Sequence, residues 1–404
     1  MKIIIHRGTN QIGGCLTELQ SNSGTKILID IGANLPDFEG NKKTEIELEG
    51  LTYGESSFEA IFITHYHGDH IGLYNKVNSN IPIYIGKISK GIYTILQKRL
   101  GKANIISKED FEKIDAFNTF SIKDKITIKD IVISPIGTDH SAFDSYMFLI
   151  EADNKKILHT GDFRIHGQRG KKLLDAVRKY VGDVDCLICE GTTLTRNDNE
   201  ILSESQLQLK AEDIFKNNKY NFILCSSTNI DRIAAFHKAA LRAHKMFVCD
   251  RYQSEILEYV SKNSRSSLYK FNESKESKIY CYGDNMIDKM REYGFVMLVR
   301  PTDRFKDIMS KFQDYHFIYS QWLGYLKGKN IDYKRIQDFV PESFEYLHTS
   351  GHATPDAIKQ IIEITNPRIV IPIHTEGKEK IKELTDKAVI LEDKEEIMIW
   401  LEKN

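Results

Sequence analysis

Apolar residues in the first 190 positions of the chain fall into short runs that are separated by Gly, Asn, Asp or Pro. Runs such as MKIIIHR, TKILIDIG, EAIFITH and SYMFLIEAD have the length and the β-branched content of strands. A helical pattern interrupts them at residues 88–101, ISKGIYTILQKRLG. The first part of the chain is therefore predicted to consist mainly of β-sheet.

The pattern changes at about residue 200, where strand-like runs begin to alternate with amphipathic helices. The helical segments 203–218 and 229–245 are followed by the apolar runs YNFILCSS and MFVCD. This alternation predicts a parallel α/β unit. After about residue 345, Thr354 and Pro355 are expected to start a helix, and the strand RIVIPIH, a further helix and two closing strands follow.

The order of these patterns predicts an α/β protein in which one unit is inserted into another. We expect residues 1–195 and 346–404 to form the outer unit and residues 196–345 to form the inserted unit. The chain of 404 residues also exceeds the size at which a single core usually stops growing. Two structural units are therefore expected on length as well.

Composition and charge restrict the class of protein. With 41% hydrophobic and 28% charged residues, the chain has the composition of an ordinary globular protein. The 56 Lys and Arg residues nearly cancel the 57 Asp and Glu residues, so a nucleic acid would have to bind a local basic patch. The start MKIIIHRGTN lacks the apolar core of a signal peptide, and no stretch reaches the roughly 20 apolar residues of a membrane span. We therefore expect a cytoplasmic protein with no membrane partner.

Six scattered cysteines are typical of a reduced cytosolic protein rather than of a disulfide framework. Cys186 and Cys189 form a C-x-x-C pattern inside a predicted strand. Positions i and i+3 of a strand point to opposite faces, so this pair cannot close on one metal ion. We interpret both residues as core cysteines.

The strongest candidate for chemistry is the segment THYHGDH, residues 64–70, which directly follows the apolar run EAIFI. It offers four potential metal ligands within six residues: His65, His67, Asp69 and His70. A loop that leaves a strand lets alternate side chains converge. We therefore expect His65 and His67 to share one divalent ion, and Asp69 and His70 to face a second ion.

Further candidate ligands stand at the ends of other apolar strands. His140 follows DIVISPIGTD and would complete the first ion's ligands, and His374 ends RIVIPIH and would complete the second's. Asp162 ends KKILHTGD, and such a carboxylate can bridge two ions about 3.5–4 Å apart. Zinc suits the histidine-rich set best, while manganese would also be accepted by the carboxylates. Metal binding can bring the pKa of a water to about 7, so hydroxide is available at neutral pH.

At this point the sequence resembles a known family. THYHGDH resembles the H-x-H-x-D-H signature of hydrolases with the metallo-β-lactamase fold, and His140 and the TGD at 160–162 resemble their later metal motifs. The resemblance implies an αββα sandwich. Asp30 in ILIDIG resembles the first conserved Asp of that fold, which would brace the ligand loop through hydrogen bonds. A loop-capping Asp after a strand is the alternative for this residue.

The C-terminal part narrows the resemblance to the β-CASP nucleases, as in ribonuclease J. Residues 348–376, HTSGHATPDAIKQIIEITNPRIVIPIHTE, are similar to motifs B and C, with His352 as the motif B histidine and His374 as the motif C ligand. Glu190 in ICEGTT falls where motif A places an acid. The middle unit would then be the β-CASP insertion. One departure is Thr375, where the family usually has Gly.

The resemblance implies a metal-dependent nuclease that hydrolyses the phosphodiester bonds of RNA from a 5′ end, internally, or both. Asp69 would belong to the catalytic centre, with a hydroxide activated by two metal ions as nucleophile. His352 would be the general acid, oriented by Glu190. The implied substrate is single-stranded RNA, with a 5′-monophosphorylated end as one option. DNA is the main competing substrate because no residue is seen to read a 2′-hydroxyl, and a homodimer is left open.

Substrate positioning is expected from two places. His348, Ser350 and the backbone around Gly351 are similar to the ribonuclease J segment that contacts substrate phosphate; a strand-to-helix turn with a polar cap is the plain alternative. The predicted helix 229–245 carries basic residues that would line a nucleic-acid channel or form a solvated face. These are Arg232, Lys238, Arg242 and Lys245.

Two other classes of function stay open at the level of sequence. Hydrolysis of a small thioester or lactone on the same fold would use the same two-metal centre, but it would not need the inserted unit. A non-catalytic RNA-binding relative predicts broken metal motifs, whereas every expected ligand is present. The nuclease interpretation is therefore preferred.

Overall fold

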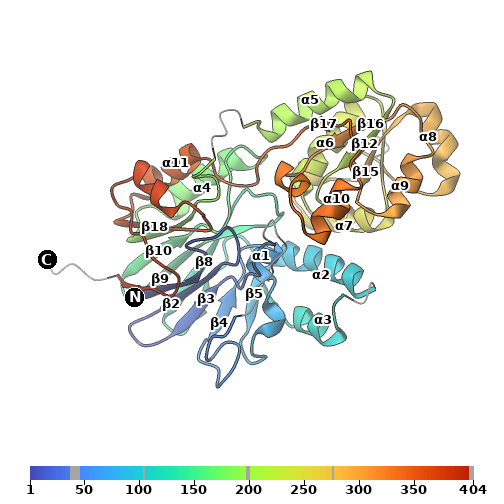
Figure 1. Ribbon diagram of the computed structural model, residues 1–404. Helices are drawn as coiled ribbons and strands as arrows, with labels where there is room; N and C mark the ends of the chain where they lie inside the picture. Colours follow the sequence, from blue (N-terminus) through green and yellow to red (C-terminus); the bar gives the residue numbers. More distant parts are fainter. Residues whose placement is uncertain (37–45, 103–104, 197–200, 275–276, 400–404) are drawn as a thin grey trace.

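The chain forms two lobes, which Figure 1 shows beside each other. The structure is a computed structural model that describes residues 1–36, 46–102, 105–196, 201–274 and 277–399. Within these ranges the strands make three sheets. Two of them belong to the first lobe, which holds both ends of the described chain, and the third belongs to the second lobe.

The first sheet of the first lobe is antiparallel at one end and parallel at the other. Its strands among the described residues, in spatial order, are β19 (Glu396–Met398), β1 (Lys2–Arg7), β2 (Leu16–Gln20), β3 (Lys26–Ile29), β4 (Ala60–Phe62), β5 (Ile83–Gly86) and β6 (Asn118–Phe120). The pairs from β3 to β6 are parallel. Because β3 and β4 end at the same edge, Asp30 lies beside the segment 64–70.

The second sheet brings the C-terminal part of the chain beside the N-terminal part. Its strands among the described residues, in spatial order, are β18 (Ile369–Ile373), β11 (Cys186–Glu190), β10 (Lys155–His159), β9 (Tyr146–Ala152), β8 (Ile131–Gly137) and β7 (Ile126–Ile128). β11 runs parallel to β10 and to β18. The segments that carry Asp162, Glu190 and His374 therefore leave the sheet at one edge.

The two sheets face each other across an apolar core. Ile3 and Phe62 of the first sheet belong to the same buried cluster as Phe148 and Ile188 of the second. Strand side chains alternate between faces, so the outer face of each sheet packs against helices. This is the predicted αββα sandwich.

Helices cover both outer faces of the sandwich. The first sheet is covered by α2 (Lys87–Lys102) and α3 (Lys108–Asp115), and the second by α4 (Gly170–Tyr180) and α11 (Pro355–Thr365). The two cysteines of the C-x-x-C pattern lie in strand β11, fully buried and unbridged, on opposite faces of the second sheet. Their interpretation as core cysteines is confirmed.

The second lobe is the predicted parallel α/β unit. Its strands among the described residues, in spatial order, are β14 (Ile279–Cys281), β13 (Met246–Cys249), β15 (Phe295–Val299), β12 (Tyr220–Leu224), β16 (His316–Tyr319) and β17 (Glu345–Tyr346). Every pair in this sheet is parallel. The expected boundary after residue 195 adjoins residues 197–200, which lie outside the described ranges.

Helices lie on both faces of the third sheet. One face carries α5 (Glu204–Asn217), α6 (Ile230–Arg242) and α7 (Arg251–Asn263), and the other carries α8 (Ile287–Tyr293) and α9 (Asp303–Met309). A short helix, α10 (Ile331–Gln337), follows β16. Local caps start several of these helices: Ser203 and Gln206 form a capping box at α5, and Thr354 accepts from the backbone N–H of Ala357 at α11.

The two lobes share one apolar core. The cluster that covers the outer face of the first sheet contains Ile61 and Ile92, and it continues through Phe236 and Ile256 of the second lobe. Helix α2 of the first lobe contacts α7 of the second. No helix within the described residues has both the length and the apolar composition to cross a membrane.

The end of the chain differs from its prediction. The helix expected after residue 374 is a 3₁₀ segment, Lys378–Glu383. Of the two closing strands, β19 alone forms among the described residues. Ala388 makes only an isolated bridge to Val370, because the backbone there forms one pair of hydrogen bonds with β18 before it turns away.

Candidate metal centre

The predicted ligands meet at the edge of the sandwich that faces the second lobe. Residues 64–70 follow β4, and the four-residue helix α1 (Gly68–Ile71) begins within them; Figure 1 shows this helix between the lobes. Tyr66 ties this segment to the second lobe, because its hydroxyl donates to the backbone oxygen of Thr228 at 2.9 Å. His140, Asp162 and His374 follow β8, β10 and β18 at the same edge.

Three imidazoles form the first group. The ligand atoms of His65, His67 and His140 all lie within 4.8 Å of one another. The backbone oxygen of Gly351 accepts from Nδ1 of His140 at 2.6 Å, so Nε2 of that ring is left to face the group, 3.2 Å from Nδ1 of His67. Burial lowers the pKa of all three imidazoles, which keeps them in the neutral form that binds metal.

A second group contains two carboxylates and two imidazoles. Asp69 Oδ2 lies 3.2 Å from Nε2 of His374 and 3.9 Å from Nε2 of His70. Asp162 Oδ2 lies 3.2 Å from Nε2 of His70 and 3.7 Å from Nε2 of His374. The same oxygen is 3.9 Å from Nε2 of His65. The carboxylate of Asp162 therefore lies between the two groups.

The residues fit a divalent cation because several of their polar atoms have no other partner. Nε2 of His65, Nε2 of His70 and Oδ1 of Asp162 are buried and make no hydrogen bond within the described part of the chain. Leaving such an atom unsatisfied costs about 1–3 kcal/mol. A cation at this position would satisfy these atoms together, and a donor set rich in imidazole suits zinc.

Asp30 and Thr64 orient one candidate ligand, His70. Asp30 has a left-handed backbone conformation, with φ of 62°, and its carboxylate accepts from Thr64 N at 2.7 Å and from His70 Nδ1 at 2.7 Å. The ring of His70 is thereby oriented with Nε2 toward the centre.

His352 and Glu190 form a hydrogen-bonded pair beside the metal ligands. Oε2 of Glu190 accepts from Nδ1 of His352 at 3.0 Å, and Asp162 Oδ2 is 3.5 Å from the same nitrogen. Burial lowers the pKa of His352, but the carboxylates of Glu190 and Asp162 outweigh burial and raise it. The His352 side chain is 22% exposed. Within this pair, the imidazole of His352 is therefore accessible to solvent, whereas Glu190 is buried.

The segment HTSGH makes contacts that the sequence did not indicate. The backbone oxygen of Ser350 accepts from Arg164 Nη1 at 3.1 Å and from His166 Nε2 at 2.8 Å. A Cβ on Gly351 would lie 2.6 Å from Ser141 Oγ, so this position has room for glycine alone. His348 lies farther along, with Nδ1 3.3 Å from Arg232 Nη1. The backbone of this segment thus supports the ligand loops.

Arg232 fits neither of the two alternatives expected for it, a nucleic-acid channel or a solvated face. Its side chain is fully buried, and it pairs with Glu204 at 3.0 Å and donates to the backbone oxygen of Thr349 at 3.0 Å. The guanidinium of Arg232 points from α6 toward α5, where the carboxylate of Glu204 neutralises its charge. Arg242, the last residue of α6, pairs with Glu212 at the surface, and Lys238 is partly buried. Lys245 lies beyond the end of the helix and is also partly buried.

Arg232 is part of a buried charge network that joins the lobes. Glu204 also accepts from Arg164 at 2.9 Å, and Arg164 pairs with Asp139 at 3.0 Å and lies 3.4 Å from Asp231. Arg164 stands two positions after a metal-ligand candidate, and Asp139 immediately precedes another. The signal in the sequence was a charged residue close to a candidate ligand: Asp139 in GTDH and Arg164 in GDFR.

Comparison with known proteins matches two families to this chain. Residues 25–217 match the family described as Beta-lactamase superfamily domain, and residues 340–390 match the Zn-dependent metallo-hydrolase RNA specificity domain. Ribonuclease J of Helicobacter pylori is 25% identical over 400 residues, which are 93% of this chain and 56% of that protein. The chain is thus similar to the ribonuclease J-like β-CASP proteins of the metallo-β-lactamase fold. The chain thus spans little more than half the length of that β-CASP relative.

Other relatives show the same extent of similarity. Ribonuclease J of Mycoplasma genitalium is 24% identical over 400 residues, covering 93% of this chain and 68% of that protein. A crystal structure of a protein of unknown function from Enterococcus faecalis V583 shares the fold, with a TM-score of 0.76 at 20% identity, and covers 98% of this chain and 99% of that one. The donor groups and the zinc-dependent family together make the centre a divalent metal site.

Proposed function

We propose that the chain is a metal-dependent ribonuclease that hydrolyses phosphodiester bonds of RNA. The observation that carries this proposal is the pair His352 and Glu190, hydrogen-bonded at 3.0 Å directly beside the metal-ligand groups. RNA is the proposed substrate because one matched family is described as an RNA specificity domain and the relatives are named Ribonuclease J.

We propose that two divalent ions, preferably zinc, are held by the two groups. The first would be bound by His65, His67 and His140, the second by Asp69, His70 and His374, with Asp162 between them. Such ions supply a Lewis acid for phosphoryl oxygens and hydroxide at neutral pH.

His352 is proposed to donate the proton that the leaving oxygen needs. Its Nδ1–H is held by Glu190, so Nε2 is the nitrogen that can reach a substrate. Ser350 and Gly351, in the preceding turn, and His348 would position the phosphate. The side chain of His352 is partly exposed while His140, Asp162 and His374 are buried, which gives substrate access to this ring.

The test is to incubate purified protein with end-labelled, 5′-monophosphorylated single-stranded RNA and with matched DNA, each with and without a chelator. The proposal predicts cleavage of RNA that stops on chelation. Mononucleotide release would indicate action from an end, and internal fragments would indicate endonucleolytic action. Turnover of a thioester or lactone without cleavage of RNA would favour the small-molecule alternative, and cleavage of DNA alone would overturn the choice of RNA.

A further inference from the structure

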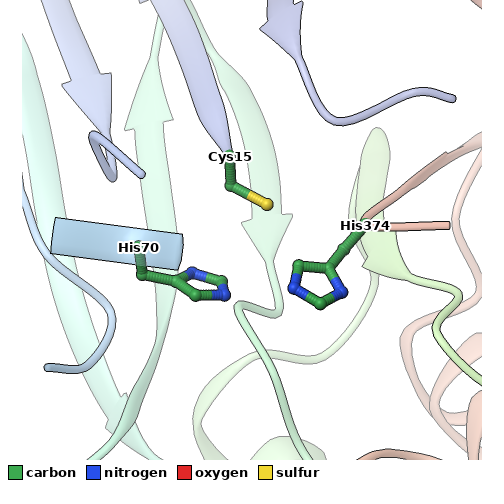
Figure 2. A group of neighbouring side chains, drawn as sticks. All are labelled: Cys15, His70 and His374. Carbon is green, nitrogen blue, oxygen red and sulfur yellow. The ribbon is translucent and has the colours of Figure 1, made fainter. Parts of the chain in front are cut away.

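Cys15 lies against the metal centre although the motifs of the sequence do not include it. It directly precedes β2 and is 2% exposed. Its Sγ and the ligand nitrogens of His70 and His374 all lie within 4.8 Å of one another. Figure 2 shows the sulfur directed toward the space between the two imidazole rings. Three donor atoms from three distant parts of the chain therefore converge on one point.

The backbone fixes Cys15 in this position. Its N–H donates to the backbone oxygen of Asp69 at 3.2 Å, and its own oxygen accepts from Gly32 N at 2.9 Å. Gly8 lies on the other side: its oxygen accepts from His374 N at 2.7 Å, and a Cβ built on it would lie 3.5 Å from the sulfur. The cysteine is thus anchored to the same loops that carry two ligands of the centre.

The plain alternative is that Cys15 fills space as a small apolar residue. The other four buried cysteines do so, since each belongs to one of the hydrophobic clusters of the described residues. Cys15 belongs to none of these clusters. Its neighbours are ionisable groups, and Nε2 of His70 beside it is buried without a hydrogen-bond partner in the described part of the chain. This surrounding suits a ligand better than a filler.

We propose that Cys15 is a further metal ligand, binding as a thiolate to the ion held by His70 and His374. The inference rests on the proposed metal centre. On binding, the S–H bond breaks, the sulfur–metal bond forms, and the proton passes to solvent. A thiolate is a softer donor than a carboxylate, so it favours zinc over manganese at this position. Cys15 would therefore determine which metal the second group accepts.

X-ray absorption at the zinc edge of the native protein tests this directly, without any substitution. A sulfur neighbour at about 2.3 Å from zinc is expected, and a spectrum with only nitrogen and oxygen neighbours would overturn the proposal. The cobalt-loaded protein should likewise show the near-ultraviolet charge-transfer band of a thiolate ligand.

Two variants test whether the sulfur neighbour of zinc is the thiolate of Cys15. Cys15→Ala should lose the sulfur neighbour and the cobalt band, and its preference for zinc over manganese should fall roughly tenfold or more. Cys225→Ala, which removes another buried thiol, should keep all three. Sulfur that persists in Cys15→Ala would refute the assignment.

The same measurements separate this inference from the proposed function. If the native protein binds zinc and cleaves RNA but shows no sulfur neighbour, Cys15 is not a ligand and the centre stands. If neither the native protein nor Cys225→Ala retains zinc, the metal centre itself is refuted, and the ligand proposal with it.

Discussion

The hydroxyl of Thr192 lies 2.8 Å from Nδ1 of His374. The same hydroxyl donates to Glu190 Oε2 at 2.7 Å. Because its one hydrogen goes to the carboxylate, Thr192 accepts from Nδ1–H of His374, which turns Nε2 of that ring toward the centre. Thr192 thus links a metal-ligand candidate to the acid that holds His352, and no motif in the sequence indicated this role.

Thr192→Val should therefore weaken metal binding without removing a ligand. Loss of such a supporting hydrogen bond typically costs 10–100-fold in metal affinity or activity. Competition with a coloured zinc chelator measures the affinity, and Thr192→Ser, which keeps the hydroxyl, should restore most of it. Unchanged zinc affinity in Thr192→Val would show that His374 is oriented by other contacts.

Asp69→Ala and His352→Ala should both abolish cleavage of RNA but differ in metal content. Asp69 Oδ2 lies among the ligand atoms, 3.2 Å from His374 Nε2, so its removal should lower the zinc bound per chain. His352 is proposed to donate a proton, so its removal should leave zinc in place. Elemental analysis of each variant beside a cleavage assay decides this.

A histidine far from the centre provides the control for this pair. His244→Asn removes an exposed imidazole, and asparagine tolerates the φ of 55° found there. It should keep both zinc and activity. Full zinc content in Asp69→Ala would contradict the ligand assignment.

The contrast between these residues explains how much of the site the sequence could predict. His65, His67 and His70 are close in the chain and follow one strand, so their convergence follows from local geometry. The place of His374 beside them depends on β18 lying next to β11. The sequence showed only that His374 ends an apolar strand, and the family resemblance supported its role. Cys15 belongs to no sequence motif of the centre. It reaches the centre only through the packing of loops that follow three different strands.

The fold shows the same division between local and distant determinants. The alternation of strand-like and helical patterns in the sequence predicted the second lobe. Each strand or helix there can be recognised from the spacing of its own apolar residues. The interpretation of helix 229–245 failed at Arg232, since the charge that buries it, on Glu204, comes from a different helix. A basic residue on an amphipathic helix is predicted to be exposed unless the acidic residue that pairs with it is known.

Arg232→Met should destabilise the protein more than a surface charge change does. Arg232 and Glu204 are both fully buried, and breaking a buried pair by removing one partner costs about 3–5 kcal/mol. Arg242→Met on the same helix removes a surface pair with Glu212 and should cost at most about 1 kcal/mol. Urea unfolding of both variants gives the comparison. Equal losses would mean that the buried network contributes no more than a surface pair.

The pH dependence of stability should report on the same network. Burial by itself raises the pKa of Glu204, but the guanidiniums of Arg232 and Arg164 outweigh burial and lower the pKa to about 2. A carboxyl whose folded pKa is lowered contributes stability above its unfolded pKa, about 4.3 for Glu, and loses it as pH falls through the folded pKa. The free energy of unfolding should therefore fall between about pH 4.3 and pH 2.

Glu204→Gln isolates this contribution. Other acids also titrate at low pH, so the informative quantity is the difference in unfolding free energy between native protein and variant, measured in chelator to exclude metal. That difference should be constant from pH 7 to about pH 5 and should shrink as pH falls toward 2, because protonation removes the same charge from the native side chain. A difference that stays constant down to pH 2 would mean that Glu204 has the same pKa in the folded and the unfolded protein.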